Sequence, residues 1–243
     1  MRFDGRSAGA LRRTRIYRSC LRHPQGSALI EMGNTKVVCA ATVEDTVPGW
    51  LRGTGKGWVT AEYGMLPGSV TGRAGRGNTG GRAQEIQRLI GRSLRAVVDL
   101  SVLGERRITI DCDVLDADGG TRTASVTAAY VALREAVDKL LAAGALAADP
   151  LVDSVAAVSV GIVRGQVLLD LAYEEDSVAE VDFNVVATGA GRLVEVQGTA
   201  EHGTFTPRDT AAIIRLALRG IGRLQNLQTS CLARPPRTTR TIL

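Results

Sequence analysis

The segment DADGGTRTAS, residues 116–125, carries groups that can hold a phosphate. Gly119 and Gly120 allow the backbone to approach a ligand closely, and Thr121 and Arg122 add a hydroxyl and a guanidinium beside a predicted helix. Helix N-termini bind anions because free N–H groups and the helix dipole point at them, and arginine adds bidentate hydrogen bonds. No GK[ST] sequence follows, so this is not a Walker A loop, and an ordinary turn with a capped helix is the commoner explanation for such a segment alone.

A second glycine–arginine sequence, GGR at 80–82, also directly precedes a predicted helix. One such sequence is common, whereas two in the same chain can converge on one anion. Arg82 and Arg122 are therefore candidate ligands of a single phosphate.

Carboxylates gather in residues 165–191, which contain no Lys or Arg. Clustered carboxylates favour a divalent cation such as Mg²⁺, and one carboxyl group can act as general acid for a leaving hydroxyl. If Asp176 and Asp182 lie across a hairpin, they form such a pair. A solvated acidic edge that prevents aggregation between strands explains the cluster equally well. The cluster comprises Asp170, Glu174, Glu175, Asp176, Glu180 and Asp182.

Basic residues are concentrated in two other segments. Residues 1–22 contain seven arginines and one acidic residue, and residues 71–95 contain six arginines and one acidic residue. Basic patches attract polyanions, because phosphate contacts release counterions. Together with the carboxylates they suggest metal-assisted chemistry on a nucleic acid, although solvated charged faces are the more common cause of such runs.

Length and composition indicate a globular protein and exclude several classes. The 243 residues are 44% hydrophobic, no run of about 18 apolar residues occurs, and the N-terminal MRFDGRSAGALRRTR is too charged for a signal peptide. We therefore expect a cytoplasmic protein without a membrane partner. The widely spaced cysteines predict buried, reduced thiols, and His23 and His202 lack the partners of a catalytic triad.

The first half of the chain must position the phosphate-binding segments. Apolar residues after the glycine-rich stretch recur at helical spacing, with Arg88, Arg92 and Arg95 on the opposite face. The predicted elements are a hairpin at 27–44, a strand at 55–67, a mobile loop at 68–81, a helix from residue 83, a strand at 106–117 and a helix at 123–144.

The second half repeats this plan. Residues 156–199 predict three or four strands with turns at 164–165 and 189–192, and residues 207–227 predict a helix. The chain therefore predicts an α+β fold made of duplicated units. We expect a first half at 1–150 with the phosphate-binding segments, a second half at 151–230 with the acidic site, and a flexible tail at 231–243.

Long segments of this chain resemble the ribonuclease PH family. They are GWVTAEYGMLP (57–67), GGRAQEIQRLIGRSLRA (80–96), DCDVLDADGGTRTASVTAAYVAL (111–133) and the strand-rich segment 156–199. The similarity extends from RFDGR near the N-terminus to about residue 207. It implies the ribosomal-protein-S5-domain-2-like fold shared with polynucleotide phosphorylase and exosome ring subunits, assembled as a hexameric ring of three dimers.

The resemblance also implies phosphorolysis. Inorganic phosphate would attack the last phosphodiester of an RNA and release a nucleoside diphosphate, and in the family this trims the 3′ ends of tRNA precursors. By the resemblance, Asp176 and Asp182 bind Mg²⁺ and protonate the leaving 3′ oxygen. Arginines and a metal are what two reacting anions require. The residues that match the phosphate site are Arg82, Gly120, Thr121 and Arg122.

The same comparison places an RNA-facing surface in the basic segment. Arg73 and Arg76 fall in the family's basic loop, and Arg88 and Arg92 lie on the helix that follows. This chain departs from the family in having a shorter loop that begins with Gly68 instead of an arginine, in Ala83-Gln84 where Thr-His is common, and in Asp116 where glutamine is typical.

Two alternatives belong to other functional classes. A non-catalytic RNA-binding ring subunit of the same fold would have lost the phosphate or metal residues, and here all of them are present. A kinase-like or GTPase domain would need a P-loop lysine, which no glycine-rich stretch of the chain provides.

Overall fold

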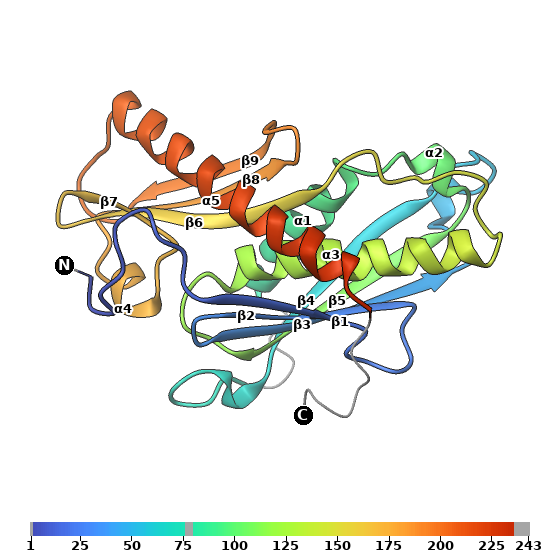
Figure 1. Ribbon diagram of the computed structural model, residues 1–243, viewed down its shortest axis with the longest axis horizontal. Helices are drawn as coiled ribbons and strands as arrows, with labels where there is room; N and C mark the ends of the chain where they lie inside the picture. Colours follow the sequence, from blue (N-terminus) through green and yellow to red (C-terminus); the bar gives the residue numbers. More distant parts are fainter. Residues whose placement is uncertain (1, 76–79, 236–243) are drawn as a thin grey trace.

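A computed structural model describes residues 2–75 and 80–235, whose strands form two sheets (Figure 1). In the first sheet, only the β4–β5 pair is parallel, and the strand order is β1-β2-β3-β5-β4. These strands are β1 (Thr14–Arg18), β2 (Gly26–Met32), β3 (Thr35–Glu44), β4 (Trp58–Met65) and β5 (Arg107–Asp116).

The second sheet is entirely antiparallel. It contains β6 (Val155–Val163), β7 (Gln166–Leu169), β8 (Val181–Thr188) and β9 (Leu193–Ala200), in the order β7-β6-β8-β9. Every residue of β6 is buried, which is typical of a central strand covered on both faces.

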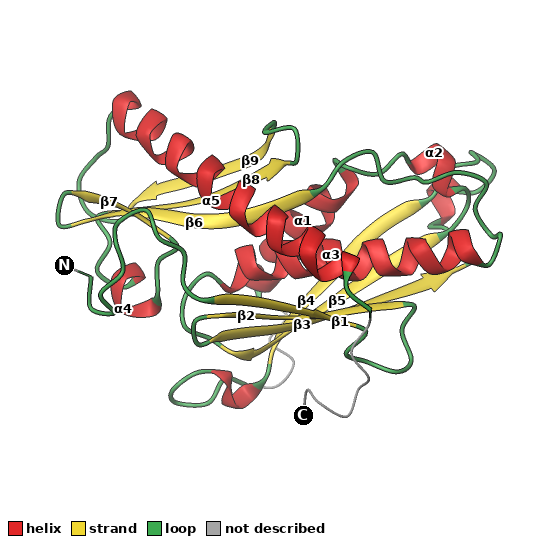
Figure 2. Ribbon diagram, in the orientation of Figure 1, coloured by secondary structure: helices red, strands yellow, loops and turns green. Residues whose placement is uncertain are grey.

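Three long helices pack on these sheets, namely α1 (Gly81–Arg95), α3 (Thr121–Ala142) and α5 (Pro207–Ala233). Helix α3 contacts β2 and β3 of the first sheet and β6 of the second, while α5 also packs on β6 and crosses α3 in Figure 2. The small side chains of α3 let both sheets approach it, and most of the helix is buried. The short helices are α2 (Leu100–Leu103), α4 (Tyr173–Asp176) and the 3₁₀ turns η1 (Gly49–Leu51) and η2 (Pro67–Ser69).

This architecture confirms the predicted α+β fold. The hairpin predicted at 27–44 is formed by β2 and β3, and β4 and β5 occupy the other two predicted strand segments of the first half. Turns at 164–165 and 189–192 separate the strands of the second sheet, as expected. All four cysteines are buried and none forms a disulfide in this structure, so the predicted burial is confirmed.

Several boundaries differ from the sequence prediction. Helix α3 begins at Thr121 and not at residue 123, so the GGTRT segment contains the first residues of the helix. Helix α4 was missed, because a single turn has no detectable period. Helix α5 continues to Ala233, so the first residues of the predicted tail are helical. Residues 76–79 of the predicted loop and 236–243 of the tail lie outside the described residues. None of the helices in the described part is long and apolar enough to cross a bilayer.

Candidate active site

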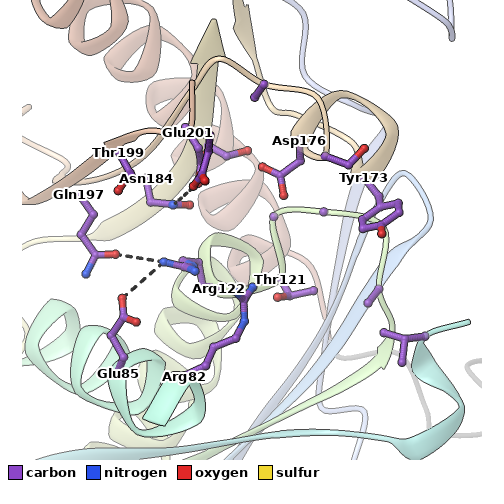
Figure 3. A pocket seen from close by; sticks show the side chains of 18 of the residues that line it. Arg82, Glu85, Thr121, Arg122, Tyr173, Asp176, Asn184, Gln197, Thr199 and Glu201 are labelled. Atoms are coloured by element: carbon purple, nitrogen blue, oxygen red, sulfur yellow. Dashed lines mark hydrogen bonds and ion pairs between the residues drawn. The ribbon is translucent and has the colours of Figure 1, made fainter. Parts of the chain in front are cut away.

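A cavity of about 1040 Å³ opens where the N-terminal ends of α1 and α3 meet α4 and the second sheet (Figure 3). Both halves of the chain build its walls, so the predicted phosphate-binding segments face the predicted acidic segment. The predicted site residues that line it are Arg82, Gly120, Thr121, Arg122, Asp176 and Asp182.

Gly119 and Gly120 form the turn between β5 and α3. Their φ angles are +73° and +65°, a region that glycine adopts without strain. A Cβ on Gly119 would lie 2.8 Å from the carbonyl oxygen of Leu171, and one on Gly120 would lie 2.9 Å from the Arg12 guanidinium. The turn therefore needs glycine both for its conformation and for its close packing.

The first turn of α3 keeps its backbone N–H groups available to a ligand. Gly120 is the N-cap residue and no side chain caps the helix there. The Thr123 hydroxyl donates to the carbonyl oxygen of Gly120 at 2.9 Å, and the Tyr63 hydroxyl donates to Thr121 Oγ1 at 2.9 Å. The N–H groups of a first helical turn have no partner within the helix, so this geometry favours an anion site over a capped turn.

Two arginines reach the same cavity from different helices. Arg122 Nη1 donates to Gln197 Oε1 at 3.2 Å and lies 3.6 Å from Glu85 Oε1. Arg82 points into the cavity from the start of α1 and has no ion pair among the described residues (Figure 3). The two glycine–arginine helix starts thus converge, as the sequence predicted.

Asp176 and Asp182 line the opposite wall, but they do not face each other across a hairpin. Asp176 ends α4 and Asp182 is the second residue of β8, because residues 173–176 form a helical turn instead of a strand. Burial, and then the neighbouring charge of Asp176, raise the pKa of Asp182 to about 6. Burial also raises the pKa of Asp176, while the charges of Arg122 and Arg82 partly oppose this shift.

The donor set of these carboxylates fits a divalent cation. Asp182 Oδ1 is buried and has no hydrogen-bond partner in the described part of the chain, whereas Oδ2 accepts from Asn184 Nδ2 at 3.3 Å. Such an oxygen costs free energy until a ligand satisfies it. No group of three or more His, Cys, Asp or Glu side chains that could hold a metal occurs among the described residues. Mg²⁺ suits a two-carboxylate site, since waters and phosphate oxygens commonly complete its shell.

The remaining acidic residues do not form one cluster on neighbouring strands. Asp170 is fully buried and pairs with Arg12 at 2.7 Å. Glu175 is also buried and accepts two hydrogen bonds from Arg2, at 2.7 and 2.6 Å. These pairs also correct the expectation that the N-terminal arginines form a polyanion-binding arm, because Arg2 and Arg12 neutralise buried carboxylates.

Arg88 and Arg92 project from α1 beside the cavity. They line a groove of about 270 Å³ that shares Glu85 and Gln197 with the cavity. Arg92 Nη1 lies 2.9 Å from Glu195 Oε2. Both predicted RNA-binding arginines of α1 therefore lie along a continuation of the site.

The other predicted surface positions have different surroundings. Arg73 is exposed in the turn after η2, and Arg76 lies outside the described residues. Arg95 leaves the expected solvent face of α1 and stacks on a tryptophan ring, 4.3 Å from its centroid. Asp116 lies 3.6 Å from Lys36, so its departure from the family pattern places a paired charge at the end of β5.

Sequence reading missed three polar residues of the site. Tyr63 belongs to no phosphate-binding motif, yet its hydroxyl donates to Thr121 Oγ1. Glu85 and Gln197 hold Arg122. Glu85 had a weak signal as the only acidic residue among 71–95, whereas Gln197 sits in an ordinary alternating strand and carries no motif.

Comparisons with known proteins agree with this geometry. The description "3' exoribonuclease family, domain 1" matches residues 10–137, and "3' exoribonuclease family, domain 2" matches residues 153–220. The chain therefore has the fold of a 3′ exoribonuclease. More narrowly, the chain belongs to the ribonuclease PH family, whose members are phosphate-dependent 3′-to-5′ exoribonucleases and nucleotidyltransferases.

Two curated relatives are similar over almost the whole chain. Ribonuclease PH of Solibacter usitatus is 56% identical over 232 residues, which cover 94% of this chain and 98% of the relative. Ribonuclease PH of Saccharopolyspora erythraea is 56% identical over 239 residues, which cover 96% of this chain and 95% of the relative. This similarity confirms the activity that the sequence resemblance implied.

Solved structures share the fold at low sequence identity. Rice Rrp46 aligns with a TM-score of 0.78 and 21% identity, covering 96% of this chain and 100% of that chain. The Archaeoglobus fulgidus exosome with RNA bound to the active site aligns with a TM-score of 0.80 and 22% identity, covering 93% of this chain and 91% of that chain. These alignments confirm the predicted fold.

Proposed function

We propose that the cavity binds the attacking phosphate at the start of α3 and the leaving end of the RNA beside the two aspartates. The observation that carries this assignment is the convergence of two arginines and a helix N-terminus on one side, with two carboxylates of raised pKa on the other. Thr121, Gly120 and the N–H groups of the first turn orient the phosphate, and Arg82 and Arg122 neutralise it.

The reaction follows from this placement. An oxygen of the bound phosphate attacks the phosphorus of the last 3′,5′-phosphodiester, a new P–O bond forms, and the bond to the 3′ oxygen of the preceding nucleotide breaks. The products are a nucleoside diphosphate and an RNA shorter by one nucleotide. The arginines reduce the repulsion between the two anions and stabilise the charge of the transition state.

The leaving 3′ oxygen must receive a proton. Burial raises the pKa of Asp182 to about 6, so this carboxyl group can hold a proton near neutral pH and donate it when it does not hold a cation. Mg²⁺ would be held by Asp176 and by the ionised form of Asp182, so the acid and ligand roles of Asp182 belong to different protonation states, and the cation would supply positive charge beside the reacting phosphates. The charges of Arg122 and Arg82 partly oppose the effect of burial on the pKa of Asp176 and so favour its ionised form.

The substrate of this site is the 3′ end of an RNA, and we assign it to tRNA precursors. Exposed Arg73 and the groove beside Arg88 and Arg92 offer phosphate contacts on the approach to the cavity. The curated relatives' name and the exosome neighbour with bound RNA support this assignment. We also propose that the protein is cytoplasmic and assembles as a hexameric ring of three dimers. Sedimentation analysis of the purified protein tests the assembly.

The decisive experiment incubates the protein with a 3′-tailed RNA and Mg²⁺, with and without phosphate. Nucleoside diphosphates should appear only with phosphate, whereas nucleoside monophosphates would indicate hydrolysis and contradict the proposal. RNA binding without any product would favour the non-catalytic ring subunit.

Arg122→Ala should raise the KM for phosphate at least tenfold, on the order of one lost charge-assisted contact. Arg215→Ala, on the exposed side of α5, is the matched control.

A further inference from the structure

Arg12 lies behind the phosphate-binding turn and outside the cavity lining. It is 5% exposed and belongs to the segment that precedes β1. Its Nη1 donates to the carbonyl oxygen of Asp118, and Nη1 and Nη2 lie 3.5 and 3.4 Å from the carbonyl oxygen of Gly119. One guanidinium thus holds the two carbonyl groups that come just before Gly120.

Thr35, the first residue of β3, holds the same turn from a second direction. Its hydroxyl donates to the carbonyl oxygen of Gly119 at 2.7 Å and accepts from the Asp118 N–H at 2.9 Å. Thr35 is fully buried, so its hydroxyl has no competing contact with solvent. The turn is therefore fixed by two side chains from distant parts of the first half.

Holding these carbonyl oxygens also fixes the direction of the N–H groups that follow. In a planar trans peptide the C=O of one residue and the N–H of the next point in opposite directions. With the Gly119 carbonyl held by Arg12 and Thr35, the Gly120 N–H points to the other side of the turn, and Gly120 lines the cavity. This N–H joins the first N–H groups of α3 as a preorganised anion site.

Arg12 is itself held by a buried carboxylate. Its backbone N–H, Nε and Nη2 all donate to Asp170, at 2.7, 3.1 and 2.7 Å. Asp170 has a left-handed backbone with φ of +55° and begins the connection from β7 to α4. Asp118 Oδ1 in turn accepts from the N–H of Tyr173, the first residue of α4. The contacts of Arg12, Asp170 and Asp118 therefore hold the phosphate-binding turn beside α4, the helix that carries Asp176.

We propose that Arg12 and Thr35 are positioning residues for the attacking phosphate. They do not touch the anion. They aim the Gly120 N–H and the start of α3 at it, and Asp170 keeps Arg12 in place. This inference rests on the phosphate site proposed above. It adds Arg12, which precedes β1, and Thr35 of β3, neither of which lies in a phosphate-binding motif.

The test uses Thr35→Val, which removes both hydroxyl contacts to the turn and the 3.5 Å contact with Arg12 Nη1, and preserves the shape of the side chain. The KM for phosphate should rise about tenfold, on the order of the loss of one to two hydrogen bonds. The kcat at saturating phosphate and the affinity for RNA should stay within about twofold, because the carboxylate wall is unchanged. Thr35→Ser, which restores the hydroxyl, should return the KM for phosphate to the wild-type value.

Two further variants separate positioning from general stability. Arg12→Lys keeps the charge beside Asp170 but loses the planar fork that reaches both carbonyl groups, so it should also raise the KM for phosphate. Thr127→Val removes a buried hydroxyl that donates to the Thr123 carbonyl oxygen within α3 at 2.9 Å and accepts from the Ala157 N–H of β6 at 3.2 Å. Thr127→Val should lower the Tm about as much as Thr35→Val does, but it should leave the KM for phosphate unchanged.

The outcomes distinguish this inference from the proposed function. If Arg122→Ala raises the KM for phosphate and Thr35→Val does not, the positioning role is wrong and the phosphate site stands. If Arg122→Ala has no effect on that KM, the phosphate site itself is wrong. If Thr35→Val and Thr127→Val lower kcat and raise the KM for phosphate and the KM for RNA to the same extent, Thr35 serves only stability and the inference is overturned. Protection from thermal unfolding by inorganic phosphate gives the same comparison without turnover.

Discussion

Arginines and carboxylates form two groups in this molecule, and the fold treats them in opposite ways. The anchor cluster consists of Arg2, Arg6, Arg12, Asp170 and Glu175, and the cavity cluster consists of Arg82, Arg122, Asp176 and Asp182. In the anchor cluster, each carboxylate accepts at least two short hydrogen bonds from an arginine. In the cavity cluster, one oxygen of Asp182 has no partner among the described residues, and Arg122 is held mainly by an amide.

The difference shows how one set of residue types can serve either stability or chemistry. Removing a carboxylate from water costs several kcal/mol on general grounds, and a well-oriented arginine offsets that cost. In the anchor cluster, arginines donate at least two hydrogen bonds to each buried carboxylate. In the described part of the cavity no arginine hydrogen-bonds to Asp176 or Asp182, and burial raises the pKa of both aspartates. A buried carboxylate without an arginine partner therefore marks a candidate reactive group better than a local excess of Asp and Glu in the sequence does.

The largest expected effect comes from Asp182→Asn. The amide keeps the shape but can neither donate a carboxylic proton nor bind a cation as an anion, so kcat should fall by about 10² to 10⁴. RNA affinity should change little, because Asp182 makes no contact with the basic groove. Single-turnover assays and RNA binding measured in parallel test this prediction. Glu174→Gln, an exposed change on the same short helix α4, is the control. Full activity in Asp182→Asn would contradict the acid and metal assignment.

The next effect compares one arginine from each cluster by stability. Arg2→Ala leaves the buried carboxylate of Glu175 without its bidentate partner and should lower the free energy of unfolding by about 3–5 kcal/mol. Arg82→Ala removes an exposed side chain and should cost less than about 1 kcal/mol. Urea unfolding of both variants measures the contrast. Equal losses would mean that the two clusters do not differ as described.

Much of this contrast could not be predicted from the sequence. The strands, the long helices and the GGTRT segment follow from local periodicity and turn residues, and the resemblance supplied the roles of Arg82, Arg122, Asp176 and Asp182. The pairing of Arg2 with Glu175 and of Arg12 with Asp170 joins residues far apart in the chain, so both charged segments read as exposed. Helix α4 was missed because a single helical turn between strands leaves no periodic pattern. For the same reason, Asp176 and Asp182 were expected to lie across a hairpin.

A third prediction concerns the dependence of metal binding on pH. Asp182 has a pKa of about 6 in the metal-free protein, above the value of about 3.9 for an unfolded chain. Its ionisation therefore costs folding stability, and this contribution is most favourable below about pH 4 and is lost as the pH rises through 6. A cation binds the ionised form, so the increase in Tm caused by Mg²⁺ should grow through pH 6 and then level off. Asp182→Asn should flatten that profile, and a profile unchanged by this substitution would remove Asp182 from the metal site.

The smallest expected effect sharpens the comparison within the cavity itself. Glu85 lies 3.6 Å from Arg122 Nη1, and its side chain is half exposed, so it competes weakly with phosphate for the guanidinium. Such an exposed pair contributes at most about 1 kcal/mol, and Glu85→Gln should therefore lower the KM for phosphate by about twofold to fivefold. Glu105→Gln, an exposed carboxylate near α2, should leave it unchanged. If Glu85→Gln instead raised the KM, Glu85 would be aligning Arg122 for phosphate, and the cavity cluster would contain a preorganising ion pair of the kind otherwise confined to the anchor cluster.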